Sequence, residues 1–195
     1  MRKVSLLAGF AAALLPAVAL AQSPDVAAVA STTSDWPLFL ALLGAAIATA
    51  LPCLGSILGV SMVGQSGAGL LTEKPDLAGR VITLAVLPGS QGLYGMVISL
   101  LFLFSFGTTL LDGTSTLTWV QGMAVFAAFI PVTFTCLTSA PYQAKVCSAG
   151  MHMLAKDGRL AGRVITMAAL VETYALLGFL ISFFMLNALK AGILA

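Results

Sequence analysis

The sequence predicts an all-α membrane protein, folded as two tandem helical hairpins of the same orientation. Of its 195 residues, 59% are hydrophobic and only 8% are charged, whereas soluble domains carry about 25% charged residues. Four long apolar segments follow one another, and a seven-residue motif occurs twice. The net charge of +2, without any run of Lys or Arg, excludes a nucleic-acid-binding surface.

The first 35 residues are expected to lie outside the membrane fold. Residues 1–21 combine a basic start at Arg2 and Lys3, an apolar core and a small-x-small ending, Ala-Leu-Ala. This pattern is typical of a cleaved secretory signal peptide, and the alternative is an uncleaved additional helix. Residues 22–35 are rich in Ala, Ser, Thr and Asp and are interpreted as a short exported tail.

Four segments are apolar enough to cross a bilayer, and each is longer than the roughly 20 residues that this requires. They cover residues 36–71, 81–106, 118–154 and 164–189. The first and third would each be on the order of 54 Å long at about 1.5 Å per residue, which exceeds a hydrocarbon core of about 30 Å. We therefore expect these two helices to project from the membrane or to tilt.

The connections between these segments differ in charge. Residues 72–80 and 155–163 together contain five Lys and Arg residues, whereas the single charged residue of 107–117 is Asp112. Basic loops favour the cytoplasmic side of a membrane. The two basic loops are therefore predicted to be cytoplasmic and both termini to face outward from the cell (inner) membrane, in agreement with an N-terminal export signal.

An internal repeat relates the two halves of the membrane region. The motif LAGRVIT occurs twice, 83 residues apart, and the same offset aligns Gly95 with Gly178. We therefore assign residues 36–106 to a first hairpin, residues 107–117 to an outer loop and residues 118–195 to a second hairpin. Such parallel repeats differ from the inverted repeats of many secondary transporters.

Glu172 is the one acidic residue inside a predicted span. It lies nine residues after Arg163, about 13 Å along a helix and close to the middle of the bilayer. A carboxylate at that depth is costly and is a functional candidate by default. Desolvation favours its protonated or cation-paired form. The alternative is a purely structural hydrogen bond between helices.

Other oxygen-bearing groups are predicted at the depth of Glu172. Gln143 precedes the centre of the second basic loop, near residues 157–158, by about 14–15 residues, and Glu172 follows it by about as many. At a similar depth in the second span, four residues share one helix face through their i, i+3, i+4 and i+7 spacing, namely Leu87, Ser90, Gln91 and Tyr94. Pro88 lacks an N–H and can free a nearby carbonyl. Such oxygen ligands suit a hard cation such as Na⁺, although each glutamine alone is equally consistent with helix packing.

The repeat is asymmetric at this point. Gly89 stands at the position that corresponds to Glu172, and Val60 at the position that corresponds to Gln143. The sequence therefore predicts one ion site for each pair of hairpins. A duplicated ancestral hairpin that has lost one carboxylate would have this pattern.

These features resemble the proteolipid ring component of V-type and V/A-type rotary ATPases, which is called c in eukaryotes and K in bacterial enzymes. The specific matches are LPGSQGLYG at 87–95 and LVETYALLGF at 170–179, supported by LLTEKPDLAG, PYQAKVCSAG and the tandem hairpins. The resemblance covers about residues 40–190 and implies that Glu172 is the ion-carrying glutamate.

The resemblance implies roles for five further residues. Gln91 and Gln143 match the glutamines of sodium-binding rings. Leu87 matches a residue that offers its backbone carbonyl, and Tyr94 matches the tyrosine that holds the glutamate in place. Ser90 stands where sodium rings usually have threonine, so that the hydroxyl oxygen is kept.

As such a subunit, the chain would form a homo-oligomeric ring with its first and third helices inside. Its partners would be the lipid bilayer, a stator membrane subunit with an essential arginine, and central-stalk subunits. The transported ion would be Na⁺ or H⁺, without any cofactor. The sequence has no GxxxxGK[ST] motif, so the chain is not expected to be an enzyme by itself. A stand-alone cation transporter or channel and a structural tetraspan protein are the alternatives.

Overall fold

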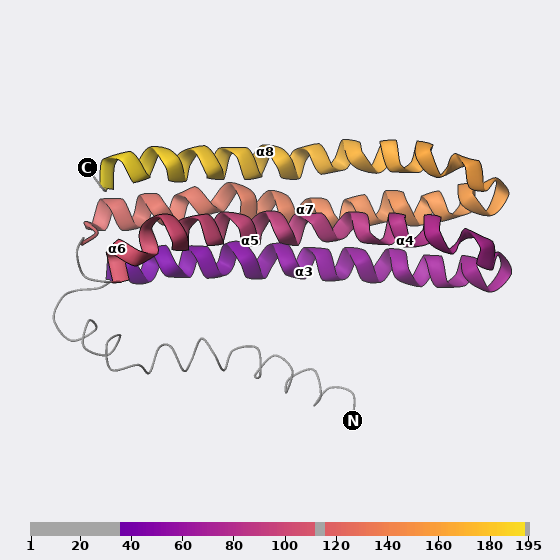
Figure 1. Ribbon diagram of the computed structural model, residues 1–195, viewed down its shortest axis with the longest axis horizontal. Coiled ribbons are helices and arrows are strands. Elements are labelled where there is room, and N and C mark those ends of the chain that lie inside the picture. The colour runs from indigo at the N-terminus through magenta and orange to yellow at the C-terminus, as the bar shows by residue number, and fades with distance from the viewer. Residues whose placement is uncertain (1–35, 112–115, 194–195) are drawn as a thin grey trace, which may run out of the picture.

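The computed structural model describes residues 36–111 and 116–193 (Figure 1). Within these residues, four long helical stretches lie side by side along a common axis, and each is long and apolar enough to cross a membrane. The prediction of an all-helical protein with four spans is confirmed. The predicted signal peptide and exported tail fall in residues 1–35, outside the described residues.

The first hairpin pairs one continuous helix with a segmented one. Helix α3 (Trp36–Glu73) continues through Pro52 without a break. The returning stretch consists of η1 (Pro75–Leu77), α4 (Ala78–Val86), η2 (Leu87–Gly89), α5 (Ser90–Phe102), η3 (Leu103–Gly107) and α6 (Thr108–Leu111). The break at η2 coincides with Pro88, which lacks the N–H that a continuous helix needs.

The second hairpin has two long helices, α7 (Trp119–Lys156) and α8 (Ala161–Ile193), joined through η4 (Gly158–Leu160). A capping box begins α7, in which the Thr118 hydroxyl accepts from the Gln121 N–H and the Gln121 side chain accepts from the Thr118 N–H. These two bonds satisfy N–H groups that a helix start leaves without an intrahelical partner.

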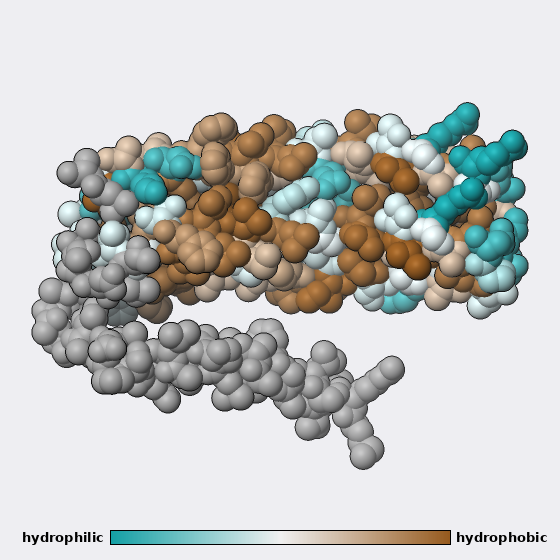
Figure 2. Space-filling model, viewed as in Figure 1, coloured by the Kyte–Doolittle hydropathy of each residue, from teal (hydrophilic) through white to brown (hydrophobic). Residues whose placement is uncertain are grey.

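The helices extend farther toward the two basic turns than the apolar spans predicted. Helices α4 and α8 begin at Ala78 and Ala161, so Arg80 and Arg163 are helical rather than part of a loop. The reason is that Arg is a good helix former, whereas a hydropathy criterion ends a span at the first charge. Figure 2 shows a large group of hydrophilic side chains at this end of the bundle, with smaller groups near its middle and at the opposite end.

Polar contacts close the two turns. Lys74 in the first turn donates from its ammonium group to the Ala155 carbonyl at the end of α7. Asp157 in the second turn accepts from the Arg159 side chain and backbone N–H and forms an exposed ion pair with it at 3.0 Å. The hydrogen bond from the Arg159 side chain, followed by that from its backbone, holds the pKa of Asp157 below its ordinary value.

The two hairpins repeat the same packing. Helix α3 packs along α7, while α5 lies against α3 and α8 against α7. A Cβ at Gly95 would meet the Ala48 carbonyl oxygen, and a Cβ at Gly178 would stand 2.8 Å from the Pro131 carbonyl oxygen. Ala48 and Pro131 are themselves 83 residues apart. The repeat found in the sequence is therefore a repeat of helix-to-helix contacts, in which glycine allows close approach.

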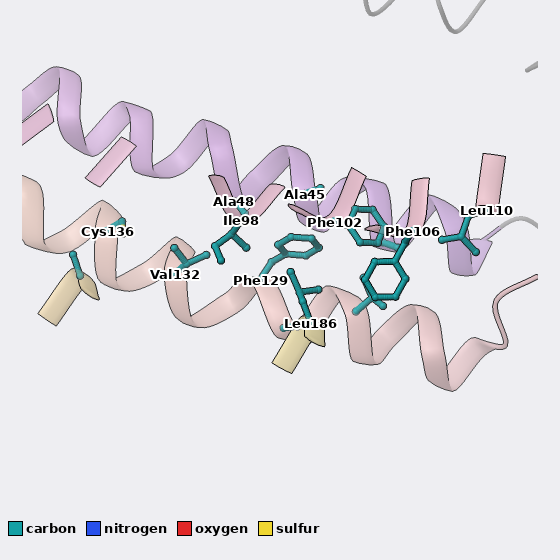
Figure 3. Close-up of a cluster of buried hydrophobic side chains, with 14 residues drawn as sticks. Ala45, Ala48, Ile98, Phe102, Phe106, Leu110, Phe129, Val132, Cys136 and Leu186 are labelled. Atoms are coloured by element: carbon teal, nitrogen blue, oxygen red, sulfur yellow. The ribbon is translucent and has the colours of Figure 1, made fainter. Parts of the chain in front are cut away.

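Buried apolar side chains form two clusters along the bundle axis. The far cluster lies away from the basic turns and includes Ile98, Phe102 and Phe129, whose rings and side chains meet between the helices (Figure 3). The turn-side cluster includes Leu84 and Leu154. Residues from the same helices between these two clusters carry the polar groups described next.

Candidate ion-binding site

The carboxyl group of Glu172 lies on α8 and is partly buried. Its Oε1 atom accepts from the Tyr94 hydroxyl at 2.6 Å and lies 2.7 Å from the Ser90 hydroxyl oxygen, both on α5. Its Oε2 atom lies 3.4 Å from the Gln143 amide nitrogen on α7. Three helices thus converge on one carboxyl group, as the depth argument from the sequence predicted.

The helix break at η2 positions the α5 side of this site. The Ser90 N–H bonds to the Leu87 carbonyl in a tight 3₁₀ turn, and the Ser90 hydroxyl oxygen lies 2.9 Å from the same carbonyl oxygen. Tyr94, one helical turn after Ser90, reaches Glu172 from the same face of α5. The Leu87 carbonyl therefore lies at the α5 side of the site, where it already accepts from the Ser90 N–H.

The two glutamines are completely buried and bonded to each other. The Gln91 amide nitrogen donates to the Gln143 amide oxygen at 2.6 Å. Gln143 donates in turn to the Ala168 carbonyl oxygen at 3.1 Å. Gln91 reaches Glu172 through Gln143 and Ser90, because its own amide oxygen lies 3.4 Å from the Ser90 hydroxyl oxygen.

Two neighbours of the site were not found from the sequence. The Ala168 carbonyl lies one helical turn before Glu172 and orients Gln143, but an alanine gives no polar signal in the sequence. Phe179 packs its ring 5.7 Å, centroid to centroid, from that of Tyr94 and so helps to orient the phenol. Its spacing of seven residues from Glu172 on α8 is the only sequence feature that could have pointed to it.

Apolar packing encloses the site along the bundle axis. Ala144 and Ala168 belong to the turn-side cluster and Leu87 packs against it, whereas Ala175 belongs to the far cluster and Tyr94 packs against it. The polar groups are therefore held in a band between two dry regions. Electrostatic interactions are stronger in such an environment than in water.

The corresponding position in the first hairpin is apolar. A Cβ at Gly89 would have the Val60 side chain as its nearest neighbour, at 3.7 Å. Gly89 and Val60 correspond to Glu172 and Gln143 in the repeat. The same two helix positions therefore adjoin each other in both hairpins, but only the second hairpin places a carboxyl and an amide there.

Comparison with known proteins identifies the class of this membrane protein. The sequence matches the family described as the C subunit of ATP synthase over residues 43–102 and again over residues 126–185. The chain belongs to this family, and the two matches fall on its two hairpins. The family resemblance expected from LPGSQGLYG and LVETYALLGF is confirmed.

Individual relatives agree with this assignment. The chain is 42% identical to the K subunit of the V-type sodium ATPase of Enterococcus hirae over 157 residues, which cover 80% of this chain and 96% of the relative. It is 36% identical to the K subunit of the A-type ATP synthase of Methanocaldococcus jannaschii, over 80% of this chain and 66% of the relative. Identity to the c′ subunit of the V-type proton ATPase of Candida glabrata is 27%, over 74% of this chain and 85% of the relative.

Proposed function

We propose that the protein is the membrane rotor subunit of a V-type ATPase and carries Na⁺ on Glu172. The observation that carries the proposal is the convergence of the Ser90 and Tyr94 hydroxyls and the Gln143 amide on a carboxyl group within a membrane span. The 42% identity to a K subunit named for a sodium ATPase supports the choice of ion. On its own the chain would transport nothing, because ATP hydrolysis belongs to other subunits.

The oxygen atoms around Ser90 favour a cation over a proton alone. Three oxygens lie within 3.4 Å of the Ser90 hydroxyl oxygen, and they belong to the Leu87 carbonyl, the Gln91 amide and the Glu172 carboxylate. A hydroxyl has one hydrogen to donate, so it cannot bond to all three at once, although the Leu87 carbonyl also accepts from the Ser90 N–H and the carboxyl group also accepts from the Tyr94 hydroxyl. A hard cation, which takes carbonyl, hydroxyl and carboxylate oxygens as ligands, would satisfy them together.

Binding of Na⁺ would require the Gln143 amide to rotate. Its nitrogen faces Glu172, and its oxygen accepts from Gln91. An amide presents either oxygen or nitrogen through a rotation of half a turn. We propose that Gln143 donates to the carboxylate when the site is empty and offers its oxygen to the ion when the site is filled. The Gln91 amide must then turn as well, because its nitrogen would otherwise face the nitrogen of Gln143.

Neutralisation of the carboxylate allows the subunit to turn through lipid. A charged carboxylate at the centre of a membrane helix costs about 2.5–3.5 kcal/mol or more, whereas an ion-paired one avoids most of that cost. Several copies would form a ring with α3 and α7 inside, and an arginine of a stator subunit would displace the ion. The central stalk would bind at the basic turns, which are proposed to be cytoplasmic, with both termini outside.

Labelling by a hydrophobic carbodiimide tests both the residue and the ion. This reagent attacks a protonated carboxyl group, so Glu172 in membranes that contain the full chain should be labelled rapidly and faster at lower pH. Na⁺ should slow the labelling at fixed pH, because an ion-paired carboxylate is not protonated. The labelled residue is identified by mass spectrometry of the digested protein.

Two controls make the result decisive. The Glu172→Gln variant should not be labelled, and K⁺ at the same ionic strength should protect far less than Na⁺. Labelling of Glu172 without any protection by Na⁺ would contradict the sodium assignment and support proton transport instead. Intact ATP-driven transport in the Glu172→Gln variant would contradict the role of this residue.

A further inference from the structure

The Ser56 hydroxyl on α3 contacts the start of α5, a helix of the returning stretch. Its oxygen accepts from the Gly92 N–H at 2.8 Å and lies 3.5 Å from the Gly89 carbonyl oxygen. Serine and threonine hydroxyls inside helices commonly bond to the carbonyl four residues earlier on the same helix, as those of Thr133 and Thr138 do here. Ser56 instead links two helices at residues that are 36 positions apart in the sequence.

The break at η2 explains why α5 needs an acceptor at this point. A helix start leaves its first N–H groups without partners inside that helix, and Gly92 is the third residue of α5. The side chain of the N-cap residue usually accepts such an N–H from an extended backbone conformation. The N-cap of α5 is Gly89, which has no side chain and has a helical backbone, with φ of −81° and ψ of −23°. The acceptor therefore comes from another helix, and Ser56 supplies it.

This contact is buried and close. Ser56 is 7% exposed, and Gly92 is buried as well. A Cβ on Gly92 would stand 3.2 Å from the Ser56 hydroxyl oxygen and 3.4 Å from the Cys53 Cα atom, so glycine at this position permits the close approach of the two helices. Because a buried N–H without an acceptor is unfavourable, the hydrogen bond from Gly92 fixes the start of α5 against α3.

The start of α5 carries one side of the ion site. Ser90 is its first residue, and the Leu87 carbonyl lies just before it, at the helix break. The Ser90 and Tyr94 hydroxyl oxygens lie 2.7 Å and 2.6 Å from Glu172. Ser56 has no hydrogen bond to Glu172 in the described part of the chain. Any effect of Ser56 on the carboxyl group must therefore pass through the first turns of α5.

The repeat supplies an internal comparison for this contact. Ser139 corresponds to Ser56, and Ala175 corresponds to Gly92. Helix α8 runs through this region without a break, so the Ala175 N–H lies inside a continuous helix and has an acceptor four residues earlier. The Ser139 hydroxyl is 3.5 Å from the Cys136 carbonyl oxygen of its own helix. A buried serine thus occurs in both hairpins, but only the serine of the first hairpin caps a helix.

We infer that Ser56 is a positioning residue of the ion site, which caps α5 from α3 and thereby holds the Leu87 carbonyl and the Ser90 hydroxyl in the arrangement that Na⁺ requires beside Glu172. The inference rests on the proposed function, in which Glu172 carries Na⁺. It adds a residue of the first hairpin's long helix to a site whose carboxyl group belongs to the second hairpin. A binding site works only when its groups are held within about 0.5 Å of the productive geometry by the residues behind them.

Protection of Glu172 from a hydrophobic carbodiimide by Na⁺ tests this role, in native membranes that contain the full chain. Ser56→Ala should raise the Na⁺ concentration for half-protection roughly three- to tenfold, a change of the size that loss of an N-cap acceptor causes. Ser139→Ala is the matched control and should leave the half-protection concentration unchanged, because Ser139 caps no helix. Equal shifts in the two variants would contradict the inference.

Two further variants separate positioning from general stability. Ser56→Thr keeps the hydroxyl and should keep the Na⁺ response of the unmodified chain. Ser90→Ala should itself weaken protection, and Ser56→Ala should add little in that background, because both changes act on the start of α5. Thermal unfolding in detergent is measured for every variant. A lower melting temperature of Ser56→Ala with unchanged half-protection, or full additivity with Ser90→Ala, would overturn the inference.

The unmodified chain separates this inference from the proposed function. If Na⁺ does not protect Glu172 in the unmodified chain, the sodium proposal fails and the role of Ser56 fails with it. If Na⁺ protects the unmodified chain and the Ser56→Ala variant at the same concentration, only the role of Ser56 fails and the sodium proposal stands.

Discussion

The two hairpins use the same packing contacts but differ in chemistry. Ser99 and Ser182 correspond in the repeat, and each hydroxyl bonds to the backbone of the helix it packs against, at Ala45 on α3 and at Val132 on α7. In contrast, Glu172 in the second hairpin corresponds to Gly89 in the first. Packing contacts are thus repeated throughout the bundle, whereas the chemical site depends on a few side chains that one repeat lacks.

The differences between the hairpins occur as a group. Where the second hairpin has Glu172 and Gln143, the first has Gly89 and Val60, and a Cβ on Gly89 would stand 3.7 Å from the Val60 side chain. A buried carboxylate without partners is strongly destabilising, because its desolvation is not compensated. Loss of the carboxyl and the amide together avoids that penalty, which explains why the first hairpin retains neither.

The largest expected effect is obtained by moving the carboxyl group between the hairpins. Glu172→Gln should abolish ion transport and Na⁺-protected labelling. The double variant Glu172→Gln/Gly89→Glu should not restore either, because Val60 supplies no amide at the new position. ATP-driven Na⁺ uptake into vesicles measures the loss, and restored uptake in the double variant would show that the two hairpins are chemically equivalent.

Removal of the amide on α7 should have a smaller effect. Gln143→Leu removes a donor to Glu172 and leaves the buried Gln91 amide without its acceptor. In the filled site proposed above, the same amide gives its oxygen to the ion. If the loss of that ligand costs about 1.5–3 kcal/mol, the range of a hydrogen bond to a charged group, the Na⁺ concentration for half-protection should rise on the order of 10- to 100-fold. Gln65→Leu is the matched control, since Gln65 is exposed on α3 and bonds only to Ser61 among the described residues. A similar shift in both variants would count against a role of Gln143 in the site.

The shared packing predicts equal effects in the two hairpins. Gly95→Ala and Gly178→Ala should each destabilise the protein by about 1–3 kcal/mol, the usual range for overpacking, because the added methyl group meets α3 in the first case and α7 in the second. Gly79→Ala and Gly162→Ala should be neutral or slightly stabilising, since a Cβ there meets nothing within 4 Å. Thermal unfolding in detergent measures all four. If only one of Gly95→Ala and Gly178→Ala destabilised the protein, the two hairpins would share their sequence pattern but not their packing contacts.

The smallest expected effect concerns the turns, where Asp157 corresponds to Lys74. Because the pKa of Asp157 is lowered in the folded protein by Arg159, its contribution to stability is present above the ordinary carboxyl pKa and is lost as the pH falls through the folded value. Asp157→Asn should therefore lower the melting temperature slightly at pH 7 and not at all below the folded pKa. High salt should reduce this difference in melting temperature at pH 7. If the difference persisted in acid, it would arise from the capping hydrogen bond and not from the charge of Asp157.

Much of the fold and part of the site could be predicted from residue types and spacing. Hydropathy located the four spans, and the offset of 83 residues located the two hairpins. Depth counted from the second basic turn placed Gln143 beside Glu172, and helical spacing placed Ser90 and Tyr94 on one face. These inferences succeeded because a membrane helix has a fixed rise per residue and must bury its polar groups.

Other features could not be obtained in this way. Helix ends at the basic turns depend on helix propensity and on contacts such as that of Lys74 with the Ala155 carbonyl, which hydropathy ignores. Gln91 was expected beside the carboxyl group, but its nitrogen bonds to Gln143 instead. The acceptor at Ala168 is a main-chain oxygen, so no polar side chain in the sequence indicated that it would bond to Gln143.

By itself, the sequence determined that the protein is a membrane helical repeat with one intramembrane carboxyl group, because both properties follow from composition and periodicity. Only the tertiary structure decided which donors point at that carboxyl group and which hydroxyl caps the start of α5. The side-chain rotations at Gln91 and Gln143, and the close approach of Ser56 to Gly92, arise from packing between helices that are distant in the sequence. Such contacts depend on how three-dimensional surfaces fit together, which residue spacing along a single helix does not specify.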